Sequence, residues 1–193
     1  MLDAKMELNY LYEAVPLLDK YLESKELFWQ LPGIAREPGN AFGALTIGVT
    51  LLMLKRVKAR SLSEKLAVER GDYETRIFQS KIHNEKAWMK KVGQDFTNRT
   101  RLWEKYLNEY HDDMLATVSS YPTHVSQRVI MQLLWEEQDS SSLLLTPLQF
   151  MIQTMDAVLK KFFLPGGFIW DPELQPGFPE DTYWYLYGTL SRK

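Results

Sequence analysis

The chain lacks cysteine entirely and has only three histidines among its 193 residues. Without cysteine there are no disulfide bonds, no thiolate metal sites and no cysteine nucleophile, so noncovalent packing must stabilise the fold. The histidines form neither a Glu-x-x-His nor a His-x-x-x-His pattern, which are the usual helical metal motifs. A glycine-rich phosphate-binding loop is missing as well. We therefore expect no metal, no cofactor, no small-molecule substrate and no enzymatic activity.

Long apolar runs are also scarce. The most apolar run, residues 41–54, would span about 21 Å as a helix, which is less than the roughly 30 Å hydrocarbon core of a bilayer. The basic residues that follow it would suit the cytoplasmic flank of a membrane anchor, but a helix buried among its neighbours is the favoured interpretation. The first residues resemble neither a secretory signal nor a transit peptide. We expect a cytoplasmic protein without a membrane anchor.

Apolar residues recur every three or four positions along most of the chain, which predicts helices rather than strands. The first helix is expected over residues 3–31 with a kink at Pro16, because proline lacks a backbone N–H. A central helix is predicted over 72–118, either unbroken or divided near Gly93, since an interior glycine weakens a helix. Further helix starts are expected near residues 41, 61, 123 and 146. The sequence thus predicts an all-α bundle of four to six helices with one long central helix.

The segment after residue 164 has a different composition. Four prolines interrupt it, yet seven aromatic residues fall within 165–193. Disordered tails are poor in aromatic residues, so this segment is expected to pack on the helices or on a partner. We therefore expect a helical bundle domain over 1–164 and an aromatic, proline-rich C-terminal segment over 165–193 that packs on it.

Positive charge is concentrated in the middle of the chain. Residues 55–105 contain fourteen Lys and Arg against seven Asp and Glu, a net charge of +7, whereas 1–54 carry −3 and 106–193 carry −6. Net charge of a segment bears on its partners more than on its fold. On an ideal helix, six of these cations fall within an arc of about 140° opposite the apolar residues. This basic stripe consists of Arg76, Lys86, Lys90, Lys91, Arg101 and Lys105.

Three kinds of anion would suit the basic stripe. The first is the chain's own acidic C-terminal segment, the second is nucleic acid, and the third is a lipid surface or an acidic protein. Lysine and arginine neutralise phosphates whatever the base sequence, which favours nucleic acid among external ligands. Rows of exposed charge commonly serve only solubility, however, and this is the simpler interpretation. The six residues are therefore candidates for anion or partner binding, with all three anions open.

Long helices, a segregated basic stripe and an aromatic C-terminal segment favour assembly over catalysis. We expect a non-enzymatic helical subunit or protein-interaction module of a larger assembly, which binds a protein partner or associates with itself. One alternative is a nucleic-acid-binding protein that uses the basic face of helix 72–118. A second alternative, from another class, is a helical metalloprotein or enzyme.

Overall fold

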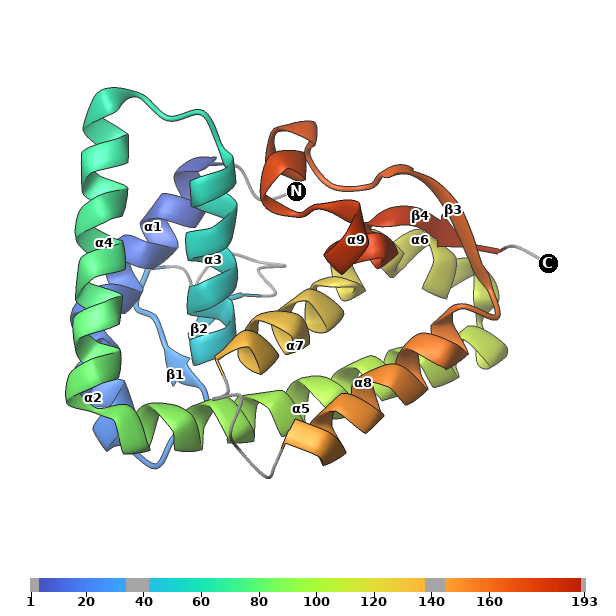
Figure 1. Ribbon diagram of the computed structural model, residues 1–193, viewed down its shortest axis with the longest axis horizontal. Coiled ribbons are helices and arrows are strands. Elements are labelled where there is room, and N and C mark those ends of the chain that lie inside the picture. Colours follow the sequence, from blue (N-terminus) through green and yellow to red (C-terminus); the bar gives the residue numbers. More distant parts are fainter. Residues whose placement is uncertain (1–3, 34–41, 138–144, 192–193) are drawn as a thin grey trace. The chain divides into compact units, whose positions relative to one another are not determined.

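A computed structural model describes residues 4–33, 42–137 and 145–191. The chain divides into two compact units, Met1–Asp95 (unit 1) and Phe96–Lys193 (unit 2). Helices dominate the described residues, and the strands there are short and form two antiparallel pairs (Figure 1). The all-α class predicted from the sequence is confirmed, and so are the long central helix and the aromatic C-terminal segment.

Unit 1 begins with a helix that Pro16 interrupts as expected, because this proline lies in a 3₁₀ turn between two helical pieces. The helical part then ends before Leu31, since Ser24 is extended and its hydroxyl donates to the carbonyl of Tyr21 at 2.8 Å. The elements of unit 1 are α1 (Ala4–Ala14), η1 (Val15–Leu17), α2 (Leu18–Glu23), β1 (Trp29–Gln30), β2 (Ala44–Leu45), α3 (Ile47–Ala59), α4 (Glu64–His83) and the first part of α5 (Glu85–Asp112).

The apolar helix α3 starts at Ile47 rather than near residue 41, which lies outside the described residues. Two side chains define this start. The hydroxyl of Thr46 accepts a hydrogen bond from the backbone N–H of Val49 at 3.2 Å, and the carboxylate of Asp95 accepts one from Gly48 at 2.8 Å. The first N–H groups of a helix have no intrahelical partner and carry partial positive charge, so an acceptor and a carboxylate stabilise them.

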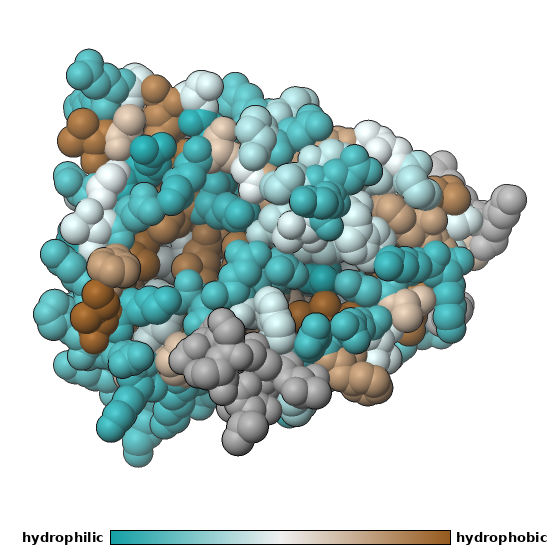
Figure 2. All heavy atoms as spheres, in the orientation of Figure 1, coloured by the Kyte–Doolittle hydropathy of each residue, from teal (hydrophilic) through white to brown (hydrophobic). Residues whose placement is uncertain are grey.

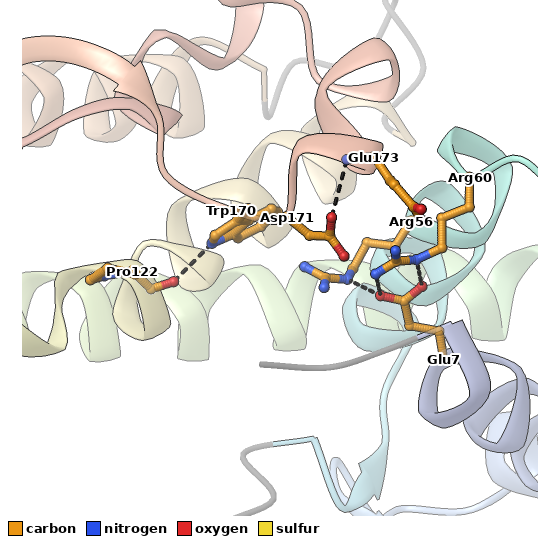
Figure 3. A network of polar contacts seen from close by, with 7 residues as sticks. All are labelled: Glu7, Arg56, Arg60, Pro122, Trp170, Asp171 and Glu173. Atoms are coloured by element: carbon orange, nitrogen blue, oxygen red, sulfur yellow. Dashed lines mark hydrogen bonds and ion pairs between the residues drawn. The ribbon is translucent and has the colours of Figure 1, made fainter.

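A buried ion cluster joins α1 to α3. Glu7 is completely buried, and its two carboxylate oxygens accept from Nε of Arg56 at 2.7 Å and from Nε of Arg60 at 2.8 Å (Figure 3). A second bond runs from Nη2 of Arg60 to the carboxylate at 3.2 Å. Removing charges from water costs several kcal/mol per ion, so such groups are stable in a core only when they are paired. The cluster therefore fixes how α1 lies on α3.

Lys91 of α5 is buried too, with 2% of its surface exposed, so its assignment to an exposed basic stripe is wrong. Its ammonium donates to the carbonyl of Glu26 and to the hydroxyl of Ser24, and it lies 4.3 Å from the ring centre of Tyr21. These acceptors follow the end of α2, where a cation is favourable. Lys91 therefore connects α5 to the end of α2 within unit 1.

Burial lowers the pKa of the Lys91 ammonium below the ordinary lysine value, and the neighbouring charge of Lys90 adds to this.

The central helix is divided, but not where glycine suggested. Gly93 lies inside α5, whereas α4 ends at His83 and α5 begins at Glu85. Asn84 leaves the helical conformation between them, and its side-chain amide donates to a carboxylate oxygen of Asp19 at 3.1 Å. A second break lies at Asp113, directly after α5. The side chain of Asp113 caps the start of the next helix, Met114–His124. The described chain consequently has more helices than the four to six expected.

Unit 2 combines the rest of α5 with shorter helices and a strand pair that the sequence pattern did not predict. Its further elements are α6 (Met114–His124), α7 (Ser126–Glu136), α8 (Leu145–Leu159), β3 (Phe163–Phe168), η3 (Pro172–Gly177), α9 (Glu180–Tyr183), η4 (Trp184–Leu186) and β4 (Tyr187–Leu190). Strands β3 and β4 pair antiparallel. Gly188 has φ +154°, and a Cβ there would lie 2.3 Å from the carbonyl oxygen of Leu164, so only glycine fits.

The aromatic C-terminal segment packs on the helices of unit 2, as predicted. The phenol of Tyr121 in α6 donates to the carbonyl of Tyr185 at 2.7 Å. In the opposite direction, the indole of Trp170 donates to the carbonyl of Pro122 at 2.8 Å (Figure 3). Tyr121 and Tyr185 are completely buried. Because buried aromatic rings contribute large apolar areas and their polar atoms here find partners, the segment is part of the core of unit 2.

We predict that Glu7→Gln destabilises unit 1 by about 3–5 kcal/mol, because it removes the carboxylate charge between two buried guanidinium groups. Urea denaturation followed by circular dichroism measures this loss. Glu23→Gln is the matched control, since Glu23 is an exposed residue at the end of α2 and should change stability by less than about 0.5 kcal/mol. Equal stability of the two variants would contradict the role given to Glu7.

We predict a pH-dependent contribution from Lys91. Between the lowered pKa of Lys91 in the folded protein and the ordinary lysine pKa, Lys91 carries its proton in the unfolded chain but not in the folded one. In this range the free energy of unfolding therefore rises with pH. At pH values that approach the ordinary lysine pKa of about 10.4 from below, the wild-type protein should therefore gain stability relative to Lys91→Met. Lys90→Met, which changes an exposed neighbour and keeps Lys91, should gain stability with pH nearly as the wild type does. Parallel stability curves for all three proteins would refute the prediction.

Candidate functional site

The structure distributes the basic stripe over two helices. Arg76 lies in α4 and the other five residues lie in α5, because the chain leaves the helical conformation at Asn84. Lys91 is buried, as described above, and takes no part in a surface. The remaining five are exposed: Arg76, Lys86, Lys90, Arg101 and Lys105. Of these, only the four in α5 share one helix.

The four exposed cations of α5 are spaced so that an ideal helix places them within an arc of about 100°. Lys86 and Lys90 belong to unit 1, whereas Arg101 and Lys105 belong to unit 2. The same arc also carries acids in its second half, and Lys105 lies 3.6 Å from Glu109. After Thr100 the face therefore contains as many acidic as basic groups. Such mixed charge is typical of a solvated surface and a poor match for a row of phosphates.

Part of the positive charge of residues 55–105 is paired with acids inside unit 1. Arg56 and Arg60 are paired with Glu7 of the N-terminal helix, and Lys58 of α3 lies 2.6 Å from Glu74 of α4. The acids in these pairs come from α1 and α4. The acidic C-terminal segment as the anion for the basic stripe stays a prediction. Charge counting identified the surplus correctly but could not show where it is compensated.

The most concentrated polar cluster of unit 2 surrounds Arg128. Its guanidinium forms two bonds with the carboxylate of Asp156, at 2.8 and 2.9 Å, and lies 4.5 Å from the ring centre of Tyr185. Burial alone would lower the pKa of Arg128, but the charge interactions with Tyr185 and Asp156 outweigh it, so the pKa is raised. A bidentate arginine that also stacks on a ring joins α7, α8 and the C-terminal segment.

The phenols around this cluster hold their protons more strongly than an ordinary tyrosine. Burial raises the pKa of Tyr183 and Tyr185, and nearby carboxylates act in the same direction on Tyr183. Both phenols therefore stay protonated at neutral pH and serve neither as bases nor as nucleophiles. In the described ranges, no three His, Asp or Glu side chains come close enough to hold a metal ion. Nor is any helix there both long and apolar enough to cross a bilayer.

A different surface stands out on α4. Its inner side is buried through Tyr73 and Ile77, whereas Val68, Phe78 and Ile82 are 64%, 61% and 58% exposed. On an ideal helix these three fall within an arc of about 80°, opposite the buried pair. Figure 2 shows hydrophobic atoms over α4 at the left of the view, surrounded by hydrophilic ones. Single exposed apolar residues are ordinary, whereas these three form an exposed apolar row on one side of the helix.

We define the outer face of α4 as the row of Val68, Gly71, Thr75, Phe78 and Ile82. It includes small residues as well as the three large apolar ones. Gly71 lies between the larger side chains, and a Cβ at this position would have nothing within 4 Å. Thr75 is exposed at the centre of the row. The face is therefore a shallow relief, with large side chains towards its ends and room between them. Such relief suits the side chains of another helix.

Sequence periodicity missed the outer face of α4 for a physical reason. Apolar residues occur on both sides of this helix, so no single side stands out as the core side. The spacing of Phe78 and Ile82 is helical, and Val68 lies fourteen residues before Ile82, which is close to four whole turns. That second row was a usable signal. Only the burial of Tyr73 and Ile77 shows which row faces solvent.

Comparison with known proteins gives no further guide to the function of these surfaces. No known protein family matches the chain, and neither a curated protein nor a solved structure is significantly similar to it.

Proposed function

We propose that this chain is a non-enzymatic protein-interaction module and that the outer face of α4 is its docking surface. The observation that carries the proposal is the exposure of Val68, Phe78 and Ile82 in one row, opposite the buried side of the same helix. An amphipathic helix of a protein that acts alone would place polar residues there. A helix with two apolar sides is expected where one side packs in the core and the other packs on a partner.

The strength of such docking can be bounded. Burying a large aliphatic or aromatic side chain contributes about 1.5–3 kcal/mol, so three of them supply a favourable term of several kcal/mol. Association also costs translational and rotational freedom, which offsets much of this gain. A surface of one helix face therefore suits a reversible complex or one contact within a larger assembly.

Location in the cytoplasm stays a prediction from the sequence.

Nucleic-acid binding through α5 has less support. Its exposed cations share their face with acids, and Lys105 already has Glu109 beside it. Without Lys91 the candidate surface also has one charge fewer than the sequence suggested. A titration with a labelled oligonucleotide at low and high salt distinguishes this alternative, because phosphate contacts weaken steeply as salt is added.

We predict that Phe78→Glu weakens binding to the physiological partner at least about tenfold, because a charge replaces an apolar side chain that the complex would bury. The measurement is the native mass of the full chain isolated under mild conditions from its own source, followed by titration of the wild type and the variant against the recovered partner. Phe78 is 61% exposed, so folding should be unaffected, which circular dichroism checks.

Leu115→Glu is the matched control, since it introduces the same charge at a 71% exposed apolar residue of α6. It should leave binding unchanged. Equal affinity of all three proteins, or a chain that stays free of any partner and any second copy, would contradict the proposed function.

A further inference from the structure

We infer that the partner on the outer face of α4 is a second copy of this chain, docked with its α4 antiparallel across a two-fold axis near Thr75. The inference rests on the proposed function, because it names the occupant of the same surface. It is carried by the symmetric spacing of the apolar residues on this face and by the order of charges beside them.

The apolar residues are arranged symmetrically about Thr75. Val68 comes seven residues before it and Ile82 seven residues after it. In an antiparallel pair with its axis at Thr75, each Val68 lies opposite the Ile82 of the other copy. Gly71 and Phe78 lie four residues before and three residues after the axis, so each Phe78 faces the open space at Gly71 of the other copy. A closed two-fold contact requires this kind of self-complementary surface.

Charges on one flank of the face agree with the same arrangement. Asp72 and Arg76 are both exposed, and helical spacing places them on the same flank, three residues before and one residue after Thr75. In an antiparallel helix pair each flank meets its own counterpart, so Asp72 of one copy faces Arg76 of the other, twice by symmetry. In a parallel pair, the flank with Asp72 and Arg76 would instead meet the opposite flank of the other copy, which carries Glu74. The carboxylate of Glu74 is already bonded to Lys58. The charges therefore select the antiparallel orientation.

The expected dimer is weak. A stable interface usually buries about 800 Å² on each partner, and a single helix face supplies less than that. The dissociation constant should then lie in the micromolar range or above, and the dimer should form as protein concentration rises. Analytical ultracentrifugation of the full chain over a concentration series measures this equilibrium.

Charge variants give the first test. Asp72→Arg and Arg76→Asp each place like charges opposite each other in the proposed dimer, so each variant alone should raise the dissociation constant about tenfold. An equimolar mixture of the two variants restores both opposite-charge contacts and should form mixed dimers with nearly wild-type affinity. Recovery in the mixture supports the antiparallel pairing. Failure to recover, or unchanged dimerisation of the single variants, overturns it.

The absence of cysteine makes a second test possible. A cysteine introduced by Thr75→Cys lies on the proposed axis, so two copies should form a disulfide bond under mild oxidation. Gln79→Cys is the matched control, since it is exposed on the same helix. Its two copies would be offset by about 12 Å along the helices, which is beyond disulfide reach. Equal cross-linking of both variants, or of neither, overturns the inference.

The two proposals fail in different ways. A chain that stays monomeric at every concentration but binds another protein, with loss of that binding in Phe78→Glu, overturns the second copy as occupant and leaves the docking surface intact. A chain that dimerises equally well with and without Phe78→Glu overturns both, since the contact then lies elsewhere. Dimerisation that Phe78→Glu abolishes and Leu115→Glu does not supports both.

Discussion

The fold of unit 1 depends on one buried carboxylate. Glu7 comes from the first helix of the chain and is completely enclosed, with a guanidinium on each side from the next long helix. Charged groups in a core tolerate little displacement, because any change in their spacing leaves a desolvated ion without its partner. Apolar side chains would stabilise the contact between α1 and α3 in several registers, whereas this cluster permits one. We regard it as the contact that selects that register. The carboxylate of Asp95, a residue of α5, binds the backbone N–H of Gly48 at the start of α3 and so fixes the opposite end of that helix.

The cluster also explains why a strongly basic middle segment does not make a strongly basic surface. Arg56, Arg60 and Lys91 all belong to the +7 region, yet each is buried against acceptors supplied by the N-terminal part of the chain. What remains outside is a set of cations with acids among them. Part of the positive charge of this segment is thus buried, and Glu7, which is distant in sequence, pairs with two of its cations. Among the described residues, by contrast, the three large apolar side chains of the outer face of α4 stay exposed, and the proposed docking surface rests on them.

Helical class, the kink at Pro16 and the packed aromatic C-terminal segment could be predicted, because each follows from local spacing or composition. The positions of the helix breaks could not. Gly93 weakens a helix only slightly, and tertiary packing holds it within α5, whereas Asn84 ends α4 with the help of a contact to Asp19 that is distant in sequence. Lys91 was placed on an exposed stripe for a similar reason. Burial of Lys91 and exposure of Phe78 are decided by neighbouring helices, and periodicity along a single helix cannot distinguish its two apolar sides.

The strand pair of unit 2 has a consequence for synthesis of the chain on the ribosome. Strand β3 finds its hydrogen-bond partner only in β4, and the phenol of Tyr110 in α5 binds the carbonyl of Ser191 at 3.1 Å. Unit 1, in contrast, is made from residues up to Asp95. At translation rates of about 5–20 residues per second, roughly 5 to 20 s separate the appearance of these two sets of partners. During that interval β3 lacks its paired strand and Tyr110 lacks its acceptor, so the aromatic residues of the second half are expected to stay exposed longer than the core of unit 1.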